Sequence, residues 1–151
     1  PSCSYITCCV KKKNLEVCAQ CDEFPCKKFN ALLEEGTKYD SFLTYQKVPH
    51  NLEFIKRYGL KEFIAQQSLR MSLLEKMIAD FDDGRSRSFY CIATALLSIK
   101  DLEDSLSQAQ QKTIEDNIDS KDVKTRAKNL RGFLNDFASR EAIELKLRKK
   151  E

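Results

Sequence analysis

Apolar residues recur every three or four positions along most of the chain, the spacing of one buried face of an α-helix. The clearest stretch runs from Leu60 to Phe81, with an apolar stripe through Met71, Leu74 and Ile78, and it ends at Asp82-Asp83-Gly84. Shorter patterns of the same kind predict further helices over residues 26–35, 52–58, 88–99, 101–118 and 123–137, with residues 37–48 as a packed connection. The fold class predicted from this pattern is mainly α.

Near the end of the chain, apolar residues recur at every second position instead of every third or fourth. Ile143, Leu145 and Leu147 alternate with charged residues, which is typical of a β-strand. A single strand is not stable alone, and the other strand-like stretch lies near Tyr5–Val10. The pattern therefore predicts one small β-pairing of the two ends of the chain.

Composition divides the chain into two parts. Six of the seven cysteines lie in the first 26 residues. A length of 151 residues suits one domain, so we expect residues 1–151 to form a single domain. Within it, residues 1–26 form a cysteine-rich metal-binding segment and residues 27–151 a helical body.

The charge and histidine content exclude several functions. The net charge of +3 is small and evenly spread, which argues against a nucleic-acid partner. A lone His50 excludes mechanisms that need two imidazoles. The sequence also contains no glycine-rich phosphate loop.

No secretory signal or membrane-spanning stretch is visible, so we expect a cytoplasmic protein with reduced thiols and no membrane partner. The chain begins at Pro1 rather than Met, which indicates processing or a missing upstream segment. In a reducing compartment, clustered cysteines are metal ligands or redox groups more often than disulfides.

The centre of the cluster is Cys18-Ala19-Gln20-Cys21, a turn that brings two sulfurs together. With Cys9 upstream and Cys26 downstream it offers four thiolates, enough for a tetrahedral Zn²⁺. Pro25 holds the chain extended, and Cys26 then begins a helix whose free N–H groups favour a thiolate. Nearby lysines would offset the negative charge of such a centre; they are Lys11, Lys12, Lys13, Lys27 and Lys28.

Other chemistries for the cluster stay open at this point. An iron–sulfur cluster, a catalytic or redox cysteine, and cysteines without any special role each fit the same residues. Cys91 lies on the apolar side of a predicted helix, so we expect it to be a buried small hydrophobe. Arg85 and Arg87 precede that helix and could hold an anionic ligand.

The stretch from Leu15 to Phe29, with its Cys-x-x-Cys-x-x-Phe-Pro-Cys block, resembles a known family. It is similar to the bacterial and archaeal domain of unknown function thirty-seven ninety-five, a cysteine-rich family taken to bind zinc. The resemblance continues through residues 51–60 and, more loosely, 84–91. It implies that Cys9, Cys18, Cys21 and Cys26 are the metal ligands. The adjacent pair Cys8-Cys9 leaves open which of the two matches the family, and Cys3 and Cys8 stay candidates for the same or a second site.

The preferred function is therefore a non-catalytic zinc-binding protein whose metal organises the N-terminal segment for structure or for a protein partner. The alternative is a thiol-dependent enzyme or redox protein that uses Cys21, Cys26 or Cys91, with an anionic ligand near Arg85 and Arg87. The family has no established activity, so the sequence leaves open whether the chain is an enzyme.

Overall fold

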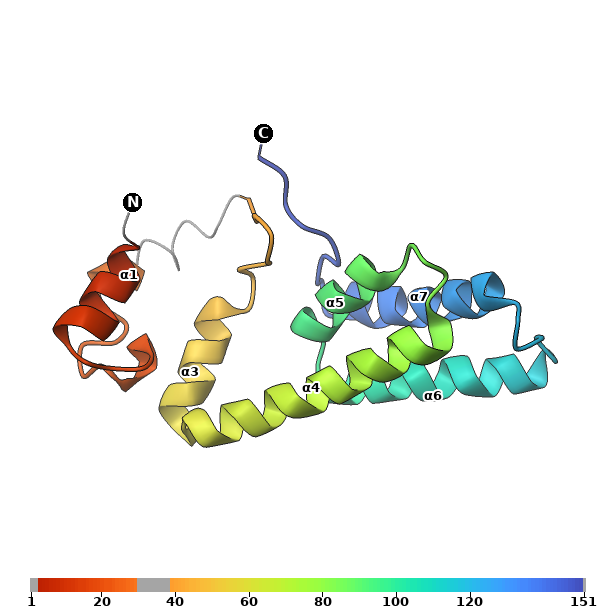
Figure 1. The fold of residues 1–151 in the computed structure, drawn as a ribbon, viewed down its shortest axis with the longest axis horizontal. Coiled ribbons are helices and arrows are strands. Elements are labelled where there is room, and N and C mark those ends of the chain that lie inside the picture. The colour runs from red at the N-terminus through yellow and green to blue at the C-terminus, as the bar shows by residue number, and fades with distance from the viewer. Residues whose placement is uncertain (1–2, 30–38, 151) are drawn as a thin grey trace. The chain divides into compact units, whose positions relative to one another are not determined.

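The computed structural model describes residues 3–29 and 39–150, and this part of the chain is mainly helical, as predicted (Figure 1). Its N-terminal segment contains short helical turns, and long helices follow from residue 48 onward. The elements are α1 (Ser4–Ile6), η1 (Thr7–Lys12), η2 (Cys18–Gln20), α3 (Val48–Tyr58), α4 (Leu60–Phe81), α5 (Arg87–Leu96), α6 (Ile99–Glu115) and α7 (Val123–Arg140).

The chain forms two compact units. One comprises residues 1–66 with 148–151, and the other comprises residues 67–147. We call them the cysteine unit and the helical unit. The prediction that the whole chain is one domain stays a prediction. Of the helix expected over residues 26–35, Lys27–Phe29 is helical and the rest lies outside the described residues.

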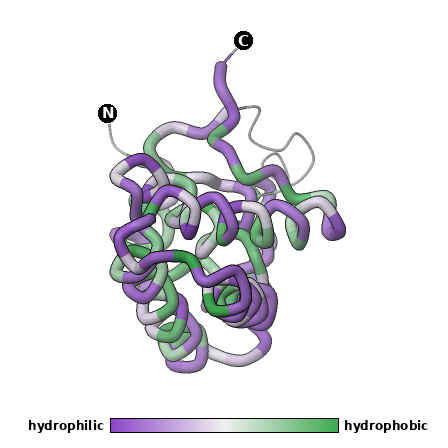
Figure 2. The backbone as a smooth tube through the Cα atoms, turned by 90° about the vertical axis from the view of Figure 1, so that its right-hand side faces the viewer, coloured by the Kyte–Doolittle hydropathy of each residue, from purple (hydrophilic) through white to green (hydrophobic). Residues whose placement is uncertain are grey.

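The helical unit is built around one apolar core to which four helices contribute. Hydrophobic and hydrophilic residues alternate along these helices, so each turns one apolar side inward (Figure 2). α6 and α7 pack side by side. The buried residues of this core are Leu73, Met77 and Phe81 of α4, Tyr90 and Ala93 of α5 with Leu97 after it, Leu102, Leu106 and Ala109 of α6, and Leu130, Leu134 and Ala138 of α7.

The apolar side of α4 differs slightly from the predicted stripe. Met71 is 56% exposed, whereas Leu73 and Met77 are buried. Leu74 packs against the edge of the core instead of its centre. Because one residue turns a helix by about 100°, a shift of one position moves the centre of the buried face by that angle.

Side chains accept backbone N–H groups just before α5 and at the start of α6. The carboxylate of Asp83 accepts the backbone N–H of Arg85 and of Ser86 at 3.0 and 2.9 Å, so the turn before α5 is closed by Asp83. Ser98 accepts the N–H of Asp101 at the start of α6. Gly84 has a φ of 81°, a conformation that favours glycine at this turn.

The predicted β-pairing of the two chain ends is wrong. Residues Tyr5–Val10 are helical, and the described residues contain no strand. Ile143 and Leu145 instead pack against the core of the helical unit, without regular backbone structure. Alternate side chains of this segment do face inward, but helices cover them. The segment therefore needs no second strand beside it.

The end of the chain is tied to the cysteine unit through Asp40. The backbone N–H of Asp40 donates to the Arg148 carbonyl at 2.9 Å. Its buried carboxylate accepts the N–H of Arg148 at 3.0 Å and that of Tyr45 at 2.7 Å. The two hydrogen bonds between Asp40 and Arg148 join residues that are 108 positions apart.

Candidate metal centre

Three short backbone segments of the cysteine unit carry the predicted ligands. Cys8 and Cys9 lie on η1, and Cys18 begins η2, with Cys21 directly after it. Cys26 precedes the helical residues 27–29, and its carbonyl accepts the N–H of Phe29 at 2.7 Å. Cys26 therefore stands at a helix start, as the sequence predicted.

The structure brings five cysteines around one cavity of about 30 Å³. All seven cysteines of the chain belong to the described residues, and each is a free thiol. A cavity of this volume has room for an ion or a water molecule and little more. The cysteines that line it are Cys8, Cys9, Cys18, Cys21 and Cys26, which include all four predicted ligands.

The cysteine thiols influence one another across this cavity. Burial raises the pKa of Cys18 to about 11, and a hydrogen bond to Cys9 and the charges of Cys9, Cys26 and Cys8 act in the same direction. Cys9 is buried, and its thiol also contacts the Leu15 carbonyl at 3.5 Å. Thiols that lie this close together raise one another's pKa, so the thiolate forms are disfavoured while the cavity holds no cation. A divalent cation among them would lower their pKa values and favour the thiolates.

Lys13 supplies a positive charge beside the cavity. Its ammonium group donates to the Cys21 sulfur at 3.1 Å and forms an ion pair with Glu23 at 2.9 Å. The hydrogen bonds to Glu23 and to Cys21 raise the pKa of Lys13. The sequence predicted a role for five nearby lysines together, and the structure selects Lys13 as one in direct contact with a candidate ligand.

Aromatic packing supports the cysteine segments. The ring centroid of Phe29 lies 4.9 Å from that of Tyr5 and 5.2 Å from that of Phe24. The ammonium group of Lys56, on α3, donates to the Phe24 carbonyl and lies over the Phe24 ring. No local sequence signal relates Lys56 to the cysteines, because they are far apart along the chain.

The described residues contain no group of three or more His, Cys, Asp or Glu side chains already arranged to hold a metal ion. The donor set nevertheless fits zinc chemically, because four thiols border one ion-sized cavity and zinc binds thiolate sulfur. Cys9, Cys18, Cys21 and Cys26 are the residues that could hold the zinc ion.

Two cysteines lie away from the cavity. Cys3 is exposed, and hydrogen bonds from the backbone of Ile6 and Tyr5 lower its pKa. Cys91 is also exposed, so the expectation that it is buried is wrong. It lines a separate cavity of about 200 Å³ in the helical unit, together with Arg70, Leu74 and other residues.

The alternative function places an anionic ligand between Cys91 and the two arginines Arg85 and Arg87, and the structure does not bring either arginine to the cavity beside Cys91. The guanidinium of Arg87 is paired with the Asp82 carboxylate, and this hydrogen bond lowers the pKa of Asp82. The cavity beside Cys91 is lined by Arg70 instead of Arg85 or Arg87. Arg70 itself donates to the carbonyls at the end of α5, at 2.6 and 2.7 Å. His50 lies on α3.

Comparison of the chain with protein-family models, curated proteins and solved structures finds no match. Among the described residues, no helix has both the length and the apolar character needed to cross a bilayer. The resemblance of residues 15–29 to the zinc-associated family therefore stays a prediction.

Proposed function

We propose that this chain is a zinc-binding protein in which Cys9, Cys18, Cys21 and Cys26 hold one Zn²⁺. The observation that carries the proposal is the cavity of about 30 Å³, which all four of these cysteines border. The family resemblance supports the same four ligands. A reducing compartment such as the cytoplasm would keep these thiols available for the metal.

The donor set favours a structural metal over a catalytic one. Four thiolates fill a tetrahedral zinc coordination sphere and leave no position for water or substrate. Lys13 contacts the Cys21 sulfur, so its charge would offset part of the negative charge of a four-thiolate centre. In this role the metal stabilises the cysteine unit and shapes its surface for a protein partner.

The three backbone segments explain what the metal would add. η1 and η2 are each only a few residues long, and helices of that length are not stable alone. One ion bound to all three segments fixes them relative to one another, so the binding free energy becomes folding free energy.

The test is elemental analysis of the protein purified without added metal. We expect about one equivalent of zinc in the wild type and a large loss in Cys18→Ser. Cys91→Ser is the matched control, because Cys91 is exposed and lies outside the cavity, and it should keep the wild-type zinc content. Less than a tenth of an equivalent of zinc in the wild type would overturn the proposal.

The same samples separate zinc from an iron–sulfur cluster, which also uses cysteine thiolates. Zinc is colourless, whereas an iron–sulfur cluster absorbs visible light and brings iron and acid-labile sulfide. Iron in place of zinc in protein purified without oxygen would contradict the proposal.

A further inference from the structure

The cavity is bordered by more thiols than a zinc ion can bind. Tetrahedral zinc takes four ligands, whereas five cysteines line this space. If the proposed function holds, one thiol is left over within reach of the metal ligands. The identity of that thiol follows from the different surroundings of Cys8 and Cys9.

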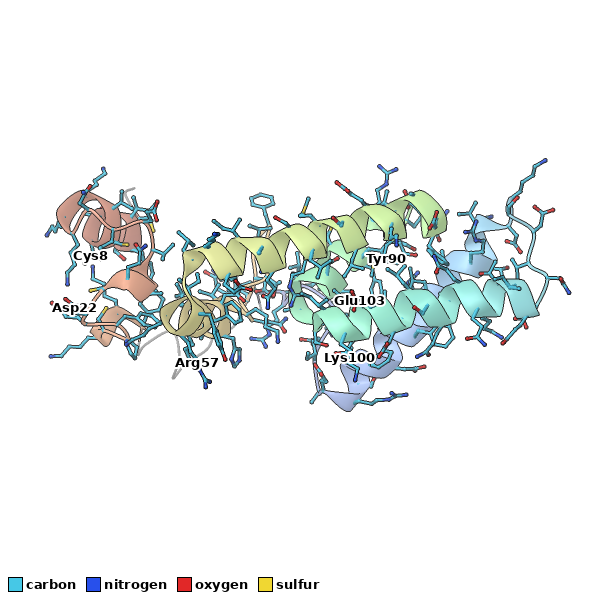
Figure 3. All side chains as sticks on the ribbon, turned by 90° about the horizontal axis from the view of Figure 1, so that it is seen from below. Cys8, Asp22, Arg57, Tyr90, Lys100 and Glu103 are labelled. Carbon is cyan, nitrogen blue, oxygen red and sulfur yellow. The ribbon has the colours of Figure 1, made fainter. Side chains whose placement is uncertain are left out.

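Cys8 and Cys9 are neighbours on η1 but differ in exposure. Cys9 is only 6% exposed, and its thiol donates to the Leu15 carbonyl, so Cys9 is the buried member of the pair. Cys8 is partly exposed while still lining the cavity. Figure 3 labels Cys8 on this N-terminal segment, with other sulfur-bearing side chains nearby. Cys8 therefore combines a partly exposed position with a place in the lining of the cavity.

We propose that Cys8 is not a zinc ligand but a redox trigger that releases the metal when a peroxide oxidises it to a disulfide with Cys18. This inference rests on the proposed zinc site. Cys18 is the expected partner because it borders the same cavity as Cys8 and, like Cys8, is partly exposed.

The chemistry requires a hydroperoxide and two thiols. The Cys8 thiolate attacks one peroxide oxygen, the O–O bond breaks, and Cys8 becomes a sulfenic acid while hydroxide (or an alkoxide) leaves and takes up a proton from solvent to become water (or an alcohol). The Cys18 sulfur then attacks the Cys8 sulfur, the S–S bond forms, and hydroxide leaves and takes up a proton to become a second water. The two sulfurs lose two electrons in total, and zinc stays Zn²⁺ throughout.

Formation of the disulfide removes one of the four ligands. A thiolate binds zinc, whereas a disulfide sulfur carries no charge and binds it poorly. The remaining three thiolates leave the ion accessible to water and to competing chelators. A small dithiol would reverse the reaction by thiol–disulfide exchange and restore the binding site.

Cys3 provides a matched control in the same segment. It is exposed, and its lowered pKa gives it more thiolate than an ordinary cysteine, so it is open to peroxide. It does not line the cavity. Oxidation of Cys3 should therefore leave the zinc in place, even though the thiol is reactive.

The experiment adds hydrogen peroxide to the zinc-loaded full chain and follows zinc release with a chromogenic chelator. We expect Cys8→Ser and Cys8→Ala to retain one equivalent of zinc and to release it about tenfold more slowly than the wild type. Cys3→Ser should release zinc at the wild-type rate. Mass spectrometry of the oxidised wild type should find a Cys8–Cys18 disulfide, and a dithiol should restore zinc binding.

Each failure has a separate meaning. If the purified wild-type protein contains no zinc, the proposed function itself is wrong. Wild type that binds zinc but releases it at the same rate as Cys8→Ser and Cys8→Ala overturns only the redox trigger. Loss of zinc in both Cys8 variants would make Cys8 a ligand and would also overturn the trigger, as would a disulfide that excludes Cys8.

Discussion

The hydroxyl group of Tyr90 makes one buried hydrogen bond in the helical unit, and a single substitution can test its contribution to stability. Tyr90 is fully buried on α5, and its hydroxyl donates to the carbonyl of Phe81, the last residue of α4, at 2.9 Å. Substitution Tyr90→Phe keeps the ring and removes the donor. The Phe81 residue is also fully buried, so its carbonyl would lose this partner in a place that water does not readily reach.

The expected cost is about 1–3 kcal/mol of the free energy of unfolding, the range for a buried polar group that loses its partner. Urea unfolding followed by circular dichroism measures it, and with a slope of about 1–3 kcal/mol/M the midpoint should fall by roughly 1 M. Tyr58→Phe is the matched control, because Tyr58 is 55% exposed and the change should be within about 0.5 kcal/mol. A Tyr90→Phe midpoint equal to that of the wild type would refute the reasoning.

The pH dependence gives a second readout of the same contact. Burial raises the pKa of Tyr90 to about 12, above the value of about 10 for an unfolded tyrosine. The neutral hydroxyl is therefore favoured by folding. Its contribution is complete below about pH 10 and is lost as the pH rises through 12. The stability difference between wild type and Tyr90→Phe should shrink across this interval, and a constant difference would contradict the assigned burial.

Three further changes test other parts of the structure. Asp40→Ala removes two hydrogen bonds to a carboxylate, so it should lower the free energy of unfolding by about 2–3 kcal/mol and make the C-terminal tail easier to cleave with protease. Unchanged cleavage would mean that Asp40 does not hold the tail. Ser98→Ala removes the N-cap of α6 and should lower the unfolding free energy by about 1 kcal/mol in a denaturant titration, whereas no loss would contradict the cap. If the chain binds zinc as proposed, Lys13→Met should weaken zinc affinity by roughly tenfold in competition with a chelator, with Lys12→Met as the control; equal affinities of the two variants would exclude a role for the contact with Cys21.

Local pattern was sufficient to locate the helices from residue 60 onward. The stretch from Leu60 to Phe81 is helical over its whole predicted length, and the helices after it begin and end near the predicted positions. The prediction succeeds because a helix repeats every 3.6 residues, so the apolar side chains of its buried face recur every three or four positions. Caps were less predictable. The side chain of Asp83, three residues before the N-cap Ser86, closes the turn that leads into α5, and only the backbone geometry shows this.

Alternating patterns were a weaker guide. Ile143 and Leu145 have the spacing of a strand, but they pack on a helical core. Period two states only that alternate side chains face inward, and it does not say what covers them. The position of Cys91 failed for a related reason. A residue at the edge of an apolar stripe is buried or exposed according to where the neighbouring helix lies, and that is not a local property.

By itself the sequence determined that the chain is mainly helical and that its cysteines concentrate near one end, since both follow from residue types and their spacing. Only the tertiary structure decided which thiols share a cavity, which of Cys8 and Cys9 is buried, and that Lys13 contacts Cys21. It also decided that Asp40 binds the backbone of Arg148 across 108 positions. The physical reason is that these contacts depend on how segments pack against one another, and packing joins residues that no local pattern relates.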